Sequence, residues 1–75
     1  MLSLEEYLKL PYTIITHEID ENEGGGWVAM FSQFGSWMLG DGDTPEEATQ
    51  NLKIIQKKLF EAILNVGEII PLPSN

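Results

Sequence analysis

The sequence predicts an α+β domain: a three-stranded antiparallel meander, one long helix and a short edge strand (β-β-β-α-β), with a short helix in front. Two observations carry this prediction. Residues 12–40 hold short runs of β-branched and aromatic side chains separated by glycine-containing turns. Residues 45–66 instead repeat apolar side chains at spacings of three and four. With 75 residues, the chain is expected to form one domain, residues 1–75.

The first two elements are predicted from capping and from β-propensity. "SLEEYLK", residues 3–9, predicts a short helix with Ser3 as N-cap and Glu6 three residues later, the spacing of a capping box. Pro11 restricts the residue before it, so the helix should end near Leu10. "YTIITHEI", residues 12–19, predicts the first strand.

Two turns are expected to join this strand to two more. "DENEGGG", residues 20–26, offers positive φ at each glycine. A phosphate-binding loop would need a helix or a lysine directly after the glycine run. The run is followed instead by a predicted strand, "WVAMF" at 27–31, so a hairpin is favoured. In this strand Trp27, Ala29 and Phe31 share one face, and Val28 and Met30 share the other. Residues 32–36 predict the second turn, and "WMLG" at 37–40 the third strand.

The long helix is predicted over residues 45–66, with its core face packed on the sheet. Its expected core stripe is Ala48, Leu52, Ile55, Leu59, Ala62 or Ile63, and Val66. Gly67 fits a left-handed C-cap. Ile54, Phe60 and Leu64 widen the apolar arc, which leaves two interpretations open: packing under the N-terminal segment, or an oligomer surface. Residues 68–70 predict an edge strand that stops at Pro71 and Pro73.

Charge and composition restrict the class of partner. Twelve acidic residues face four lysines and no arginine, for a net charge of −8. Binding to nucleic acid is not expected, because phosphates are bound by Lys and Arg. A basic protein partner is favoured electrostatically, and the alternative is that acidity only maintains solubility. The absence of cysteine excludes disulfides and zinc thiolates. Neither a membrane-spanning run nor a signal peptide is recognisable, so a cytoplasmic protein is expected.

The stretch "GDGDTPEEA", residues 40–48, places four carboxylates close together. A calcium loop that starts at Asp41 would need ligands at positions five and twelve, but these are Pro45 and Leu52. A helix start explains more: Thr44 as N-cap, Pro45 at N1 and Glu47 at N3, a capping box. The two glycines, Gly40 and Gly42, are expected to turn the chain out of the strand. No catalytic, metal or cofactor site is predicted.

Contacts with a partner are expected at the first turn and at aromatic side chains near the hairpins. Exposed aromatic residues often anchor interfaces, although core packing is the default for most of them. His17, the single histidine, is expected at a solvent edge or partly packed on its strand. The predicted partner-binding residues are Asp20, Glu21, Glu23, Trp27, Phe34 and Trp37.

Four motifs in order resemble one known family. They are "LPYTI" at 10–14, "DENEGGGWVA" at 20–29, "GDGDTPEEA" at 40–48 and "GEIIPLP" at 67–73. The set resembles the N-terminal domain of HicB-like antitoxins from bacterial toxin–antitoxin pairs. The resemblance implies a partial ribonuclease-H-like β-β-β-α-β fold. It also implies a partner, HicA, a small basic ribonuclease that cleaves messenger RNA and whose active site the antitoxin blocks.

Two features depart from the family pattern. The prolines and cysteine that usually precede the third strand are absent from residues 32–37, which puts toxin contacts there in doubt. Many members also continue into a DNA-binding domain. This chain ends at Asn75, and we expect a single-domain member that forms a homo-oligomer and does not bind DNA. The alternatives are a stand-alone homo-oligomeric module without a toxin and, more remotely, a metal-dependent nuclease that uses converging acids.

Overall fold

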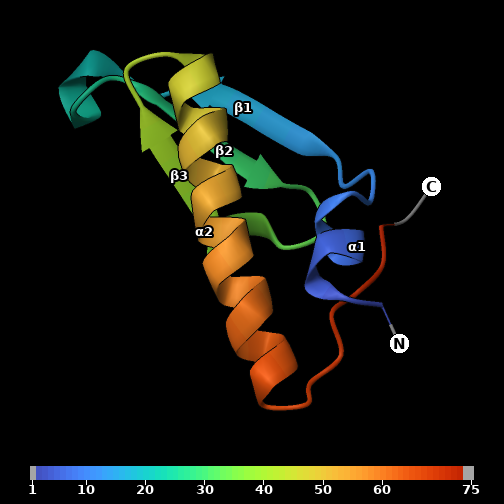
Figure 1. Cartoon of the computed structure of the whole chain (residues 1–75). Coiled ribbons are helices and arrows are strands. Elements are labelled where there is room, and N and C mark those ends of the chain that lie inside the picture. The colour runs from blue at the N-terminus through green and yellow to red at the C-terminus, as the bar shows by residue number, and fades with distance from the viewer. Residues whose placement is uncertain (1, 74–75) are drawn as a thin grey trace.

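The chain folds as a short helix, a three-stranded sheet and a long helix (Figure 1). The computed structural model describes residues 2–73. Helix α1 is Leu4–Leu8, strands β1, β2 and β3 are Ile14–Glu18, Trp27–Phe31 and Leu39–Gly42, and helix α2 is Pro45–Asn65. Two short 3₁₀ turns, Glu21–Glu23 and Gly35–Trp37, lie between the strands. The α+β class, the meander and both helices are therefore confirmed.

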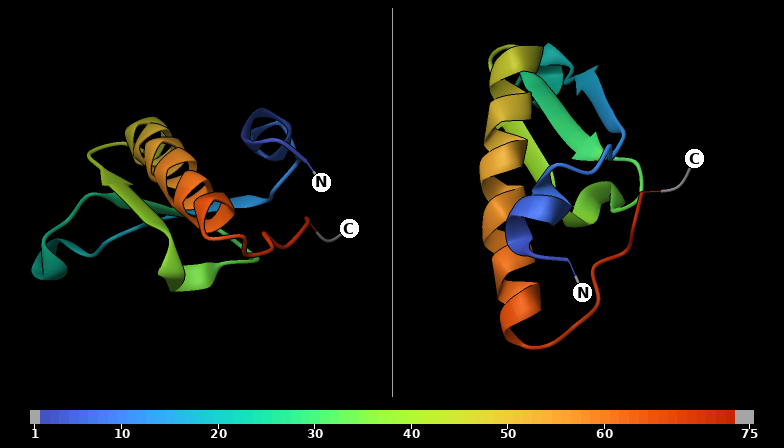
Figure 2. Two further views of the ribbon diagram at one scale, coloured as in Figure 1. Left: turned by 60° about the horizontal axis from the view of Figure 1, so that its bottom comes forward. Right: turned by 45° about the vertical axis from the view of Figure 1, so that its right-hand side comes forward.

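The sheet has the order β1-β2-β3, and both neighbouring pairs are antiparallel. Ala29 is opposite Thr16 on β1 and Gly40 on β3, so these three residues share the face of the sheet on which α2 packs. Helix α2 lies over this face with α1 packed beside it, and within residues 2–73 no ribbon covers the opposite face of the strands (Figure 2). The domain therefore consists of two layers, with the core between the sheet and the helices.

Strand β3 begins two residues later than predicted, because residues 35–37 form a 3₁₀ turn. Gly40 and Gly42 are consequently inside the strand and do not turn the chain out of it. A Cβ added at Gly40 would lie 2.7 Å from the Cα of Leu52, and one at Gly42 would lie 2.7 Å from the backbone nitrogen of Ala48. The role of these two glycines is to let α2 approach β3 closely.

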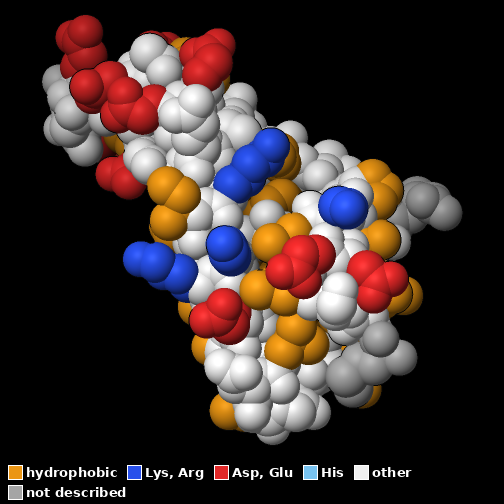
Figure 3. Space-filling model, viewed as in Figure 1, with side chains coloured by type: hydrophobic (Ala, Val, Ile, Leu, Met, Phe, Trp, Pro, Cys, Tyr) orange, Lys and Arg blue, Asp and Glu red, His pale blue; other side chains and the backbone are white. Residues whose placement is uncertain are grey.

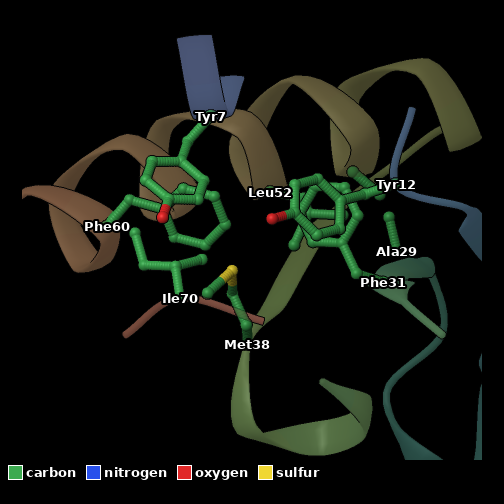
Figure 4. Close-up of a cluster of buried hydrophobic side chains, with 9 residues drawn as sticks. Tyr7, Tyr12, Ala29, Phe31, Met38, Leu52, Phe60 and Ile70 are labelled. Carbon is green, nitrogen blue, oxygen red and sulfur yellow. The ribbon is translucent and has the colours of Figure 1, made fainter. Parts of the chain in front are cut away.

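Four aromatic side chains, from both helices, the sheet and the segment before β1, lie among the nine buried hydrophobic residues of the core (Figure 4). Tyr12 makes edge-to-face contacts with Phe31 and Phe60, at ring-centroid distances of 5.8 and 5.7 Å. Tyr7 of α1 meets Phe60 at 6.3 Å. Such pairs stabilise a small core beyond the area that they bury. The buried hydrophobic residues are Tyr7, Tyr12, Ala29, Phe31, Met38, Ala48, Leu52, Phe60 and Ile70.

The buried stripe of α2 differs from the predicted one after its first two members. The buried residues are four apart throughout: Ala48, Leu52, Gln56 and Phe60. Ile55 and Leu59 flank the core and are only partly buried. Val66 is 74% exposed, so its assignment to the core face was wrong. The physical reason is that α2 extends beyond the end of the sheet, where its last turn meets no strand (Figure 1).

The C-terminal edge strand is not formed, and residues 67–73 run as an irregular segment. The helix ends in a Schellman motif: Gly67 has φ +77°, its N–H donates to Leu64, and the N–H of Glu68 donates to Ile63. Pro71 and Pro73 have no N–H for a ladder. The segment is instead held by the buried side chain of Ile70 and by a hydrogen bond from the Tyr12 hydroxyl to the Pro71 carbonyl.

Helix α1 begins with the predicted capping box. The N–H of Glu6 donates to Ser3 Oγ at 3.2 Å, and the N–H of Ser3 donates to Glu6 Oε1 at 2.9 Å. The hydrogen bonds from Ser3 hold the pKa of Glu6 below its usual value.

Candidate functional site: an acidic end and a partly apolar sheet face

One end of the molecule gathers most of its negative charge (Figure 3). Trp27 of β2 pairs with Glu18 of β1 on one side and with Gly42 of β3 on the other. The loop after β1 and the turn after β3 therefore lie at the same end of the strands. The four lysines, Lys9, Lys53, Lys57 and Lys58, lie elsewhere in the chain. We define the acidic end as eight exposed residues: Glu18, Asp20, Glu21, Glu23, Asp41, Asp43, Glu46 and Glu47.

The loop of the acidic end has a defined conformation. The Asp20 carboxylate accepts a 3.0 Å hydrogen bond from the N–H of Asn22, and the Asp20 carbonyl accepts from Gly25. Gly24, Gly25 and Gly26 all have positive φ, at 112°, 72° and 92°. Only glycine adopts such values without strain, so the run returns the chain into β2. The predicted contact residues Asp20, Glu21 and Glu23 are all exposed on this loop.

A surface hollow of about 330 Å³ separates this loop from the start of α2. Its lining includes the glycine run, Trp27, Asp41, Asp43, Glu47 and Asn51. The Asn51 amide donates to the Asp41 carbonyl and ties helix to strand. Within residues 2–73, no three Asp, Glu or His side chains converge as a metal site would require.

Helix α2 begins as predicted at Thr44, whose Oγ1 accepts a 3.1 Å hydrogen bond from the N–H of Glu47, with Pro45 at the first helical position. The second hydrogen bond of the predicted capping box, from the N–H of Thr44 to the Glu47 side chain, is replaced by another. Glu47 Oε1 accepts from the N–H of Asp43 at 3.4 Å, one residue before the N-cap. The Glu47 side chain packs against Gly42, where an added Cβ would lie 2.8 Å from it, and this contact directs it toward Asp43.

The three predicted contact aromatics lie in different places. Trp27 is partly buried and lines the hollow of the acidic end. Phe34 packs against Tyr12, Phe31 and Phe60 and belongs to the rim of the core. Trp37 is 59% exposed and lies 5.9 Å from Phe34, beside an apolar hollow that Ile63, Ile69 and Pro71 also line. Only Trp27 therefore joins the acidic loop.

The predicted oligomer surface on α2 is not a continuous patch. Phe60 is fully buried among aromatic rings, so its assignment to a surface was wrong. The i, i+4 stripe that begins at Ala48 carries it into the core. Leu64 is partly buried against the core, which agrees with the alternative interpretation for that residue. Ile54 alone is strongly exposed, at 55%.

The sequence prediction missed the rest of the acidic end and the uncovered face of the sheet. The acidic end could have been predicted from the meander, because antiparallel neighbours bring residues 20–23 and 41–47 to the same end of the strands. The uncovered face could have been predicted from the alternation of side chains along each strand, which places Ile15 and His17 on the same face as Val28 and Met30. The outward side chains of β3, Leu39 and Asp41, could not be assigned while that strand was placed at 37–40.

No family model matches this chain, and neither the search of curated proteins nor that of solved structures found a match. Within residues 2–73, no helix has the length and apolar character needed to span a membrane.

Proposed function

We propose that this chain is an antitoxin-like binding module that neutralises a small basic ribonuclease of the HicA type by covering its active site. The observation that carries the proposal is the acidic end, where eight exposed carboxylates lie together and the four lysines lie elsewhere. Such a surface attracts a strongly basic protein and raises its rate of association.

Further support comes from the ordered motifs that resemble HicB-like antitoxins. Two of the four motifs, residues 20–29 and 40–48, supply seven of the eight residues of the acidic end. The acidic loop is held by Asp20 and the glycine run, so its carboxylates can meet a partner without a large loss of conformational freedom. The active site of a ribonuclease binds phosphates and is therefore basic, which makes it a natural target for this surface.

The experiment mixes the chain with a purified HicA-type toxin and measures both binding and cleavage of messenger RNA. We expect a complex that weakens as salt rises, together with loss of cleavage. No binding at micromolar concentration and low salt would contradict the proposal for that toxin.

Two triple variants with the same change in net charge test the location of the site. Asp20→Asn/Glu21→Gln/Glu23→Gln neutralises the loop and keeps an acceptor at position 20. Glu5→Gln/Glu61→Gln/Glu68→Gln removes three charges outside the acidic end. We expect the first variant to slow association by about tenfold and the second to have little effect. Equal effects would show that net charge alone, and not the acidic end, attracts the toxin.

A further inference from the structure

The uncovered face of the sheet carries a row of apolar side chains. Ile15, Met30 and Leu39 are opposite one another on the three strands. Ile15 is 46% exposed, Leu39 is 38% exposed and Met30 is half-buried. Helix α2 covers the other face, and α1 packs beside it (Figure 2). We define the open face as Ile15, His17, Val28, Met30, Leu39 and Asp41.

A second copy of the chain does not suit the open face. Three strands about 4.8 Å apart, two about 17 Å long and β3 about 14 Å long, give a footprint of roughly 230 Å² per copy. The two footprints together are about 460 Å², whereas stable interfaces bury about 1,200–2,000 Å². If the strands of the two copies ran in the same direction, the two acidic ends would also repel each other.

The open face and the acidic end are continuous. Two residues beyond Ile15 and Leu39, about 7 Å along the strands, lie His17 and Asp41, with Val28 between them. The next residues along the chain lead directly into the acidic end, through Glu18 on β1 and Asp43 after β3. A single partner can therefore contact apolar side chains and carboxylates at the same time, over an area larger than either part.

We propose that the open face is the apolar half of the partner site and takes a basic protein that presents an apolar ridge beside Lys or Arg side chains. This inference rests on the proposed function and adds to it the chemistry of the partner surface. The carboxylates attract the basic groups and govern association, and the row Ile15–Met30–Leu39 governs dissociation by burial. A partner that is basic but entirely polar would meet only half of the site.

Two synthetic peptides of about 18 residues, long enough to form a helix on binding, test this chemistry. One alternates Leu and Lys with the period of an amphipathic helix, and the other replaces each Leu by Ser at the same charge. We expect the Leu/Lys peptide to bind the wild-type chain at least about tenfold more tightly, because only its leucines can be buried on the open face. Equal affinities of the two peptides would overturn the proposal.

Matched variants locate the binding. Leu39→Ser should remove most of the advantage of the Leu/Lys peptide, and Ile54→Ser should leave it intact although Ile54 is the more exposed side chain. Thermal unfolding checks that each variant is folded, and Ile15→Ser replaces Leu39→Ser if the latter is not. An equal loss in Ile54→Ser would overturn the proposal. So would a dimer of the chain alone, seen by sedimentation, that Leu39→Ser dissociates, since the second copy would then be the occupant.

The same variants separate this inference from the proposed function. If the wild-type chain and Leu39→Ser bind a HicA-type toxin with equal affinity, the inference fails and the function stands. If the toxin does not bind at all while the peptides are discriminated as expected, the assignment of the toxin fails and the apolar half of the site stands.

Discussion

The hydroxyl of Tyr12 donates a 2.6 Å hydrogen bond to the carbonyl oxygen of Pro71, 59 residues later in the chain. The bond joins the segment before β1 to the C-terminal segment, and the Tyr12 ring packs against Phe31 and Phe60 on the way. A side chain therefore holds the C-terminal segment in the position where the sequence predicted a strand.

Tyr12→Phe should lower the free energy of unfolding by about 1 kcal/mol, because it removes this bond and keeps the ring.

Burial, with a smaller contribution from Tyr7, raises the pKa of Tyr12. A folded-state pKa above the unfolded one gives stability that is complete below the unfolded pKa and is lost as pH rises through the folded pKa. The wild-type chain should thus lose stability at alkaline pH more steeply than Tyr12→Phe. The free energy of unfolding is measured with urea across pH 8–12. Tyr7→Phe, which removes a hydroxyl from the same core, is the control, and we expect it to change the free energy of unfolding less than Tyr12→Phe does.

Gly40→Ala should destabilise the chain by about 1–3 kcal/mol or more, because the added methyl group would meet the backbone of Leu52 and Ala48 and push α2 away from β3. Asp41→Ala is the matched control. It lies next in the same strand, its side chain is exposed on the open face, and its effect should stay within about 0.5 kcal/mol. Similar losses in both variants would mean that the close contact between Gly40 and α2 is not what makes the Gly40→Ala change costly.

Phe60→Ala should cost about 3–5 kcal/mol, since the ring is fully buried and contacts Tyr7, Tyr12 and Phe34. Ile54→Ala, on an exposed side of the same helix, should change stability by less than about 0.5 kcal/mol. Urea unfolding measures both, with Phe60→Leu as a milder substitution if the alanine variant does not fold. A small effect of Phe60→Ala would mean that this side chain is not in the core.

The fold could be predicted from the sequence where local signals and packing agree. The caps at Ser3, Thr44 and Gly67 and strand β2 were correct because each depends on neighbouring residues only. The errors arose from tertiary contacts. Gly40 and Gly42 look like turn residues, but close contact with α2 requires them in the strand.

The candidate site shows the same division. The acidic loop was recognisable from its composition, whereas its combination with residues 41–47 depends on the register of three strands. The buried position of Phe60 depends on a stripe of period four, which local spacing does not distinguish from the stripe through Ile55 and Leu59. Ile70 is buried without any strand, because it packs on the core and a side chain holds the segment around it.

Ser3→Ala should raise the pKa of Glu6 only part of the way to its usual value. It keeps the backbone N–H of Ser3, which is the main cause that lowers this pKa, and removes the side-chain hydrogen bond, which is the second cause. A lowered folded-state pKa gives α1 stability that is present above the unfolded pKa and lost as pH falls through the folded pKa. Amide signals of α1, followed by NMR during an acid titration, should report fraying as Glu6 becomes protonated. Ser36→Ala, at an exposed serine in the second turn, should leave the titration of Glu6 unchanged. A pKa of Glu6 at its usual value in the wild-type chain would show that the capping box does not form in solution.

Thr44→Ala should lower the free energy of unfolding by about 1 kcal/mol, the usual cost of losing an N-cap oxygen. In the wild-type chain the N–H of Glu47 donates a hydrogen bond to Thr44 Oγ1. In the variant this N–H would have to donate to water. In a domain of this size the melting temperature should fall by about 4–8 °C, and Gln50→Ala, an exposed substitution on the same helix, should leave it unchanged. EDTA should not shift the melting temperature of either protein, because the turn is held by caps and by close contact of Glu47 with Gly42. A drop in melting temperature with EDTA, restored by calcium or magnesium, would instead make the carboxylates of residues 41–47 cation ligands.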